Sequence, residues 1–157
     1  MYVPEGAGFR LASVEEIRAT AHRLVDHHYR CREPVLEDPA KLHACLRQHL
    51  GLKHYEVFGC LHLTKRHRLI AMTDLFRATI DRCRVYAREV VKSVLLHGAA
   101  DVVLYHNHPS GDSTPTAVDR EMHHTLVQAL DLIDVPILDH LIVGEKVFSF
   151  RQARLLR

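Results

Sequence analysis

The spacing of hydrophobic residues predicts two kinds of secondary structure along the chain. Apolar positions recur every three or four residues at about 87–97 and 116–132, as expected of amphipathic helices. Shorter runs of β-type composition predict strands at about 54–63, 67–74, 79–85, 101–106, 137–143 and 146–150. Strands interspersed with helices, hairpin turns included, indicate an α+β fold with a mixed β-sheet flanked by helices.

The N-terminal part of the chain predicts helices rather than strands. Ser13 and Glu16 have the spacing of a capping box, which opens a helix that runs to about Arg32. Asp38, which precedes a proline, starts a second helix that runs to about Leu50.

The length and composition fit one ordinary hydrophobic core. The chain has 157 residues, of which 47% are hydrophobic. We expect this core in a main domain over residues 54–157, with residues 1–53 as a helical N-terminal extension packed on it. No apolar run approaches the roughly 20 residues that span a bilayer, and the polar N-terminus is not a secretory signal, so we expect no membrane partner. The cysteines are widely spaced, without a Cys-x-x-Cys pair, and indicate reduced thiols in a cytoplasmic protein.

The charge distribution does not by itself indicate a nucleic-acid partner. The net charge is +2, with 8 Lys and Arg against 7 Asp and Glu in residues 1–53, and 13 against 12 in residues 54–157. A basic cluster at residues 65–68 lies between two strand-like runs, where a solvated hairpin turn is preferred over a phosphate-binding patch. DNA therefore stays open as a partner without support from charge, and nothing in the sequence indicates an oligomeric state.

The strongest chemical signal is the motif His106-Asn107-His108-Pro109, with a Thr eight residues and an Asp eleven residues after the second histidine. A His-x-His pair alone says little, because about one such pair is expected by chance in a chain with 14 histidines. The further spacing lowers the chance expectation to roughly 0.006. Side chains two apart on extended backbone point to the same side, and a proline favours extended backbone at the residue before it. His106 and His108 are therefore predicted to bind one metal ion together with Asp119.

Two imidazoles and one carboxylate are ligands that suit Zn²⁺. Three protein ligands leave the fourth tetrahedral position open for water, which is typical of a catalytic zinc and not of a structural one. The sequence therefore predicts a Zn²⁺ site that activates water near neutral pH.

Thr116 and Asp119 also have a purely structural interpretation. Thr-x-x-Asp before an apolar stripe is close to a capping box, with Thr116 as the N-cap and Asp119 in the first turn of the helix. The two interpretations are compatible, because an Asp in the first turn is held rigidly and can face the loop that carries the histidines. Asp112, in that loop, is the alternative ligand.

A hydrolytic zinc site also needs a carboxylate that shuttles protons and is not itself a ligand. Glu56 lies near the start of an apolar strand-like run, where a carboxylate is costly to bury. Glu89, beside Arg88, has instead the position of a solvated acid on the first turn of a helix. We therefore predict that Glu56 is the proton shuttle.

The remaining histidines are weaker candidates. Adjacent histidines on a predicted helix, as at residues 123–124, point about 100° apart and rarely serve one ion. His123 follows Asp119 by one helical turn, so a supporting hydrogen bond is the functional alternative to simple helix packing. Asp139 and His140 point to opposite faces of a predicted strand, so one of them could support the site.

With these residues in place, the sequence resembles known metalloproteases. Glu56, the His106-x-His108 pair and Thr116-x-x-Asp119 resemble the JAMM signature of JAB/MPN metalloproteases. A second set of motifs resembles the RadC-like branch of that superfamily over roughly residues 54–152: His106-Asn107-His108-Pro109-Ser110-Gly111-Asp112, Leu138-Asp139-His140-Leu141-Ile142-Val143-Gly144 and Ser149-Phe150. The resemblance implies that residues 54–157 form a RadC-like JAB/MPN domain.

The resemblance further implies a zinc-dependent metallopeptidase or isopeptidase, with His106, His108 and Asp119 as zinc ligands. Glu56 would take a proton from the nucleophilic water and return it to the leaving amine, while zinc and Thr116 would stabilise the oxyanion. The implied substrates are peptide or isopeptide bonds, and the RadC-like branch also suggests an association with DNA repair or mobile elements.

Two features depart from the family pattern. Thr116 stands where JAMM proteins typically have Ser, so it keeps a hydroxyl and adds a methyl group. Residues 1–53 show no Gly-x-Gly hairpin between two helices of the kind that forms the helix-hairpin-helix region of fuller RadC-like proteins. We therefore expect a short RadC-like protein that consists of the JAB domain and a helical N-terminal extension.

Two alternative functions fit part of the pattern. A nucleobase deaminase also uses zinc and a Glu shuttle, but its His-x-Glu and Pro-Cys-x-x-Cys ligands are missing, and every cysteine precedes His106. A non-catalytic DNA- or protein-binding module that retains the metal site is the main alternative to an enzyme.

Overall fold

The computed structural model describes residues 2–5, 8–21, 37–51, 53–77 and 85–156. The chain begins with a short antiparallel hairpin of β1 (Tyr2–Glu5) and β2 (Gly8–Leu11), which the sequence did not predict.

A helix at residues 14–21 follows this hairpin, and its predicted capping box is confirmed. The Ser13 backbone N–H donates to a Glu16 carboxylate oxygen at 2.8 Å, and the Glu16 N–H donates to the Ser13 hydroxyl at 3.2 Å. The predicted continuation of this helix to Arg32, and residues 79–84 of a predicted strand, lie outside the described residues.

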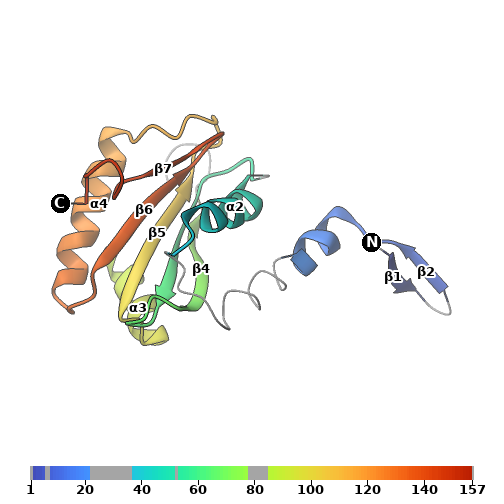
Figure 1. Cartoon of the computed structure of the whole chain (residues 1–157), viewed down its shortest axis with the longest axis horizontal. Helices are drawn as coiled ribbons and strands as arrows, with labels where there is room; N and C mark the ends of the chain where they lie inside the picture. Colours follow the sequence, from blue (N-terminus) through green and yellow to red (C-terminus); the bar gives the residue numbers. More distant parts are fainter. Residues whose placement is uncertain (1, 6–7, 22–36, 52, 78–84, 157) are drawn as a thin grey trace.

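A mixed sheet of five strands forms the centre of the molecule (Figure 1). The strands are β3 (Val57–Leu63), β4 (Leu69–Arg77), β5 (Asp101–Asn107), β6 (Ile137–Val143) and β7 (Val147–Ser149). Their order is β4-β3-β5-β6-β7, with β5 and β6 parallel and every other pair antiparallel. The predicted α+β fold with a mixed sheet is confirmed.

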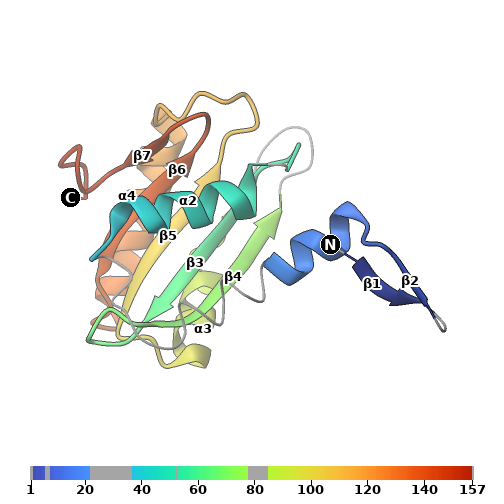
Figure 2. The same cartoon turned by 45° about the vertical axis from the view of Figure 1, so that its right-hand side comes forward.

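Helices cover both faces of this sheet (Figure 2). One face packs against α2 (Pro39–Leu50), and the other packs against α3 (Ala87–His97) and α4 (Ala117–Asp131). Alternation along β5 explains the two cores, because Val103 and Tyr105 face α2 while Val102 and Leu104 face the other two helices. By the same alternation His106 lies on the face of α3 and α4.

The parallel pairing of β5 with β6 determines where the functional residues meet. Parallel neighbours need a crossover connection, and here α4 supplies it. The chain therefore leaves the end of β5, forms a loop, and enters α4 at the same end of the sheet. No helix among the described residues is long and apolar enough to cross a membrane.

The basic cluster at residues 65–68 forms the predicted turn between β3 and β4. Two side chains of the turn contact the carboxylate of Asp101, which is buried at the start of β5. Lys65 Nζ lies 3.4 Å and His67 Nε2 lies 3.8 Å from its oxygens.

The second N-terminal helix, α2, is part of the core although the expected domain boundary places it before residue 54. Its Leu42, Leu46 and Leu50 are buried against β3, β5 and β6. A polar cluster adds to this packing, since the Asp74 carboxylate on β4 accepts from Lys53 Nζ at 2.6 Å and from the Tyr105 hydroxyl at 2.8 Å. Residues on both sides of the expected boundary therefore share one core.

We predict that Leu46→Ala lowers the free energy of unfolding by about 2–5 kcal/mol, because it leaves a cavity between α2 and the sheet. Leu46 is 0% exposed. The matched control is Leu132→Ala, at a leucine that is 86% exposed, where the change should stay within about 0.5 kcal/mol. Chemical denaturation measures both, and equal small effects would show that α2 is not part of the cooperative core.

Candidate metal centre

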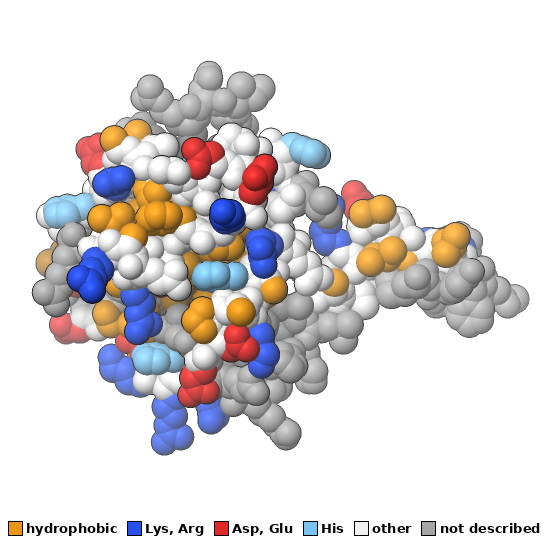
Figure 3. Space-filling model, turned by 45° about the horizontal axis from the view of Figure 1, so that its top comes forward, with side chains coloured by type: hydrophobic (Ala, Val, Ile, Leu, Met, Phe, Trp, Pro, Cys, Tyr) orange, Lys and Arg blue, Asp and Glu red, His pale blue; other side chains and the backbone are white. Residues whose placement is uncertain are grey.

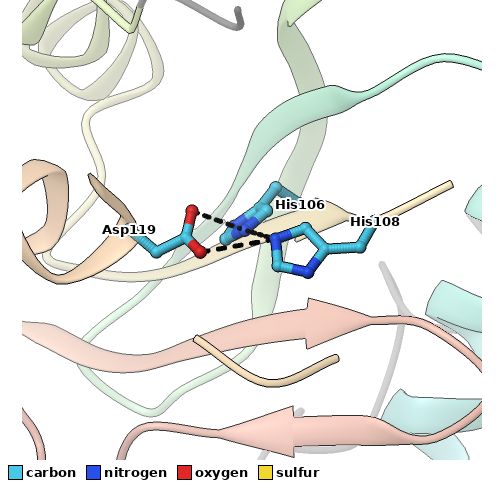
Figure 4. A group of neighbouring side chains, drawn as sticks. All are labelled: His106, His108 and Asp119. Atoms are coloured by element: carbon cyan, nitrogen blue, oxygen red, sulfur yellow. Dashed lines mark hydrogen bonds and ion pairs between the residues drawn. The ribbon is translucent and has the colours of Figure 1, made fainter. Parts of the chain in front are cut away.

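The two histidines of the His-x-His motif and the Asp of α4 meet at the end of β5, as predicted (Figure 4). His106 is the second-to-last residue of β5, and His108 directly follows the strand. Asp119 is in the first turn of α4. The Nε2 atoms of the histidines are 3.1 Å apart. His106 Nε2 lies 3.2 Å from one carboxylate oxygen of Asp119, and His108 Nε2 lies 3.4 Å from the other. Within the described residues, these three side chains form the one group that could hold a metal ion.

His108 is oriented so that Nε2 offers a lone pair to this group. Its other ring nitrogen, Nδ1, lies 2.7 Å from the backbone carbonyl oxygen of Asp112. A carbonyl oxygen only accepts, so Nδ1 carries the proton and a neutral ring leaves Nε2 unprotonated. The Asp112 carboxylate, the alternative ligand, instead accepts from the Thr114 N–H at 2.9 Å within the loop.

Asp119 has the predicted capping role, and its carboxylate also lies against the two histidines. The capping box is complete, because the Asp119 N–H donates to the Thr116 hydroxyl at 3.1 Å and the Thr116 N–H donates to Asp119 Oδ2 at 2.8 Å. The Thr116 hydroxyl also donates to Oδ2, at 2.7 Å. These bonds fix the carboxylate in the orientation that faces the histidines.

The electrostatics of the three groups favour a bound cation. Burial alone would raise the pKa of Asp119, but the two neighbouring histidine rings and the hydrogen bonds from Thr116 hold that pKa well below its usual value. The adjacent Asp119 carboxylate raises the pKa of His108 by more than burial lowers it. An ionised carboxylate and two ring nitrogens directed at one point are a donor set that fits a divalent metal such as zinc.

Glu56 lies just before β3, on the cleft that His108, Thr116 and Asp119 also line. The cleft has a volume of about 1080 Å³. Burial raises the pKa of Glu56, against the opposing effect of the two histidines. Glu89, the other candidate shuttle, lies instead on the surface of α3, with Arg88 Nε at 3.4 Å.

Asn107, between the two histidines, connects β5 to the backbone on either side of Glu56, a role that was not predicted from the sequence. Its Oδ1 accepts from the Val57 N–H at 2.7 Å, and its Nδ2 donates to the Tyr55 carbonyl at 3.0 Å. The two bonds hold the backbone on either side of Glu56. Asn107 is 3% exposed, so the bonds are formed away from water.

Asp139 and His140 point to opposite faces of β6, as the alternation predicts. His140 is on the side of the metal group, with Nε2 at 2.9 Å from His106 Nδ1. Asp139 accepts from the Ser149 hydroxyl at 2.6 Å and from the Arg151 N–H at 3.0 Å, and so anchors the C-terminal turn. His123 Nδ1 lies 3.3 Å from His140 Nδ1. The supporting hydrogen bond suggested for His123 by its spacing from Asp119 is therefore one to His140 and not to Asp119 itself.

Comparison with known proteins gives this arrangement a family context. A family model described as "RadC-like JAB domain" matches residues 36–155, which include α2 and the five-stranded sheet. The chain is similar to curated proteins named "UPF0758 protein". One from Janthinobacterium sp. (strain Marseille) is 49% identical over 118 residues, or 74% of this chain and 53% of that protein. One from Xanthomonas campestris pv. campestris (strain 8004) is 46% identical over 114 residues, or 73% and 51%. One from Stenotrophomonas maltophilia (strain K279a) is 45% identical over 137 residues, or 87% and 58%. The chain therefore spans about half the length of the curated relatives it matches.

We predict that Asn107→Leu lowers the free energy of unfolding by about 1–3 kcal/mol, because it leaves the N–H of Val57 and the carbonyl of Tyr55 without partners in a buried place. Gln128→Leu, at an exposed amide on α4, is the control and should change stability by less than about 0.5 kcal/mol. Unfolding in denaturant measures both. An Asn107→Leu protein as stable as the wild type would mean that the two bonds do not hold this backbone.

Proposed function

The chain belongs to the RadC-like JAB domain family, and from this premise we propose that it is a zinc-dependent hydrolase that cleaves amide bonds. The observation that carries the proposal is the convergence of His106, His108 and Asp119 beside a cleft. Three protein ligands leave a fourth position for water or substrate, which is the arrangement of a catalytic zinc. When bound, Zn²⁺ would act as a Lewis acid toward a carbonyl and make water a better nucleophile at neutral pH.

Glu56 is the general base and then the general acid in this proposal. It lines the cleft beside the ligands without being one of the three. It takes a proton from the attacking water and delivers it to the leaving nitrogen as the carbon–nitrogen bond breaks, so the carboxylate is regenerated. Its raised pKa supports both steps, because a carboxyl group whose pKa is closer to neutral holds a proton more readily between them.

Thr116 first serves to position Asp119 in this proposal. Its hydroxyl proton is donated to Asp119 Oδ2, and its oxygen accepts from the Asp119 N–H. Thr116 also lines the cleft, so the hydroxyl stabilises an oxyanion only if it turns from the carboxylate toward the substrate. In the observed orientation Thr116 therefore positions Asp119 and does not stabilise the oxyanion.

The cleft supports a peptide or isopeptide substrate with an apolar group near the bond that is cleaved. Beyond the ligands it is lined by aliphatic side chains: Val85, Ala87, Val118, Met122 and Leu126. Val118 is 69% exposed at this wall, so its side chain is accessible to an apolar group of the substrate.

DNA is a weaker candidate partner. Lys and Arg side chains are interspersed with acidic and hydrophobic ones on the face drawn in Figure 3. The net charge of +2 agrees with this mixture.

We predict that Glu56→Gln keeps its zinc and loses at least about 100-fold in the rate of hydrolysis, because the amide cannot accept the proton of the attacking water. The measurement combines elemental analysis of both proteins with assays on a panel of fluorogenic peptide and isopeptide substrates.

Glu121→Gln is the matched control, since Glu121 lines the same cleft from the exposed side of α4. It should retain activity within a few fold. Equal activity of Glu56→Gln and wild type would remove Glu56 from the mechanism. A zinc-loaded wild type that hydrolyses no substrate of the panel but binds DNA or a protein would instead indicate a non-catalytic binding module.

A further inference from the structure

Three buried histidines form a continuous chain that starts behind the metal group. His106 Nδ1 lies 2.9 Å from His140 Nε2, and His140 Nδ1 lies 3.3 Å from His123 Nδ1. The chain crosses from β5 to β6 and on to α4. His106 and His140 are 0% exposed and His123 is 3% exposed, so water does not compete for these bonds.

Aromatic neighbours fix the planes of these rings. Phe58 stacks on His106 at 6.2 Å between ring centroids and 21° between planes. Phe150 stacks on His140 at 4.8 Å and 25°. Rings held in this way keep their nitrogens directed along the chain, so each hydrogen bond has one donor and one acceptor of defined identity.

The two histidine ligands differ in how their protons are fixed. For His108 the carbonyl of Asp112 fixes the proton on Nδ1 by itself. For His106 the partner is another imidazole, which can donate or accept. The direction of that bond therefore depends on what holds His140.

A metal ligand role for His106 Nε2 defines the direction of every bond in the chain. A neutral His106 that binds metal through Nε2 carries its proton on Nδ1 and donates it to His140 Nε2. His140 Nε2 accepts that bond, so the proton of a neutral His140 is on Nδ1. That proton is donated to His123 Nδ1, which leaves the proton of His123 on Nε2.

The far end of the chain is compatible with this direction. His123 Nε2 is buried and forms no hydrogen bond with any described residue. Burial lowers the pKa of the His123 ring, which favours its neutral form with a single proton. With Nδ1 as the acceptor from His140, that proton is on Nε2.

We propose that His140 and His123 are positioning residues that hold His106 in the Nδ1-protonated form and so present its Nε2 lone pair to the metal. The inference rests on the proposed metal-binding role of His106 and adds two residues that touch neither metal nor substrate. His123 stands one helical turn after Asp119, so α4 provides one ligand and also supports another.

The test is the zinc affinity of the whole chain, measured by competition with a chromophoric chelator in His140→Phe and His140→Gln. Phe keeps an aromatic ring but removes the acceptor, and we expect the affinity to fall about 10- to 100-fold. Gln places an amide oxygen near the position of Nε2 and should recover most of that loss. His62→Phe is the control, because His62 is also 0% exposed but bonds the Ser93 hydroxyl at 3.1 Å, away from the ligands.

A second pair of variants tests the outer member of the chain. His123→Phe should weaken zinc binding and alter the visible absorption of the Co²⁺-substituted protein, whereas His123→Asn, which keeps an acceptor near Nδ1, should restore both. This pair keeps the inference testable if His140→Phe fails to fold.

The outcomes separate this inference from the proposed function. Wild-type zinc affinity in folded His140→Phe and His123→Phe would overturn the positioning role and leave the hydrolase proposal intact. An equal loss in His62→Phe, or no recovery in either conservative variant, would also overturn it, because the effect would then be general destabilisation. A wild type that binds no zinc would overturn the proposed function itself.

Discussion

The parallel pairing of β5 with β6 is the constraint on which the site depends. It forces the chain to cross over through α4, so the end of β5 and the start of α4 meet at one end of the sheet. His106 and His108 lie at that end of the sheet, and Asp119 lies beside them in the first turn of α4. The same pairing brings His140 of β6 next to His106, so one crossover assembles both the candidate ligands and their proposed support.

The surroundings shift the pKa values of two carboxyl groups on one cleft in opposite directions. Asp119 lies against both histidine rings and accepts hydrogen bonds from Thr116, and these neighbours lower its pKa and favour the ionised form that suits a cation. Glu56 is half-buried, and burial raises its pKa. Environments that separate the pKa values of two nearby acids are how a protein assigns ligand and proton-transfer roles to the same chemical group. The Asn107 amide holds Glu56 in place relative to Asp119, because it forms hydrogen bonds with the backbone on both sides of Glu56.

The convergence of the three candidate ligands could be predicted from the sequence because their geometry is local. Alternation along extended chain brings His106 and His108 to one side, and the capping spacing fixes Asp119 relative to Thr116, so neither needs knowledge of the sheet. The contacts of His140 and His123 depend on strand register and helix packing, which no spacing encodes in a chain with many histidines. The role of Asn107 could not be predicted for the same reason, since its partners Tyr55 and Val57 lie just before and at the start of another strand, β3. The β1–β2 hairpin was missed because its strands have only four residues each, too short for alternation to be recognised.

The metal content of the purified chain is the most direct test of this account, because every assigned role depends on a cation between His106, His108 and Asp119. The account predicts about one zinc per folded chain after zinc add-back and removal of free metal, and none in a His108→Ala, Asp119→Ala double variant that still folds. A wild type that is folded, monodisperse and free of zinc after the same treatment would contradict it.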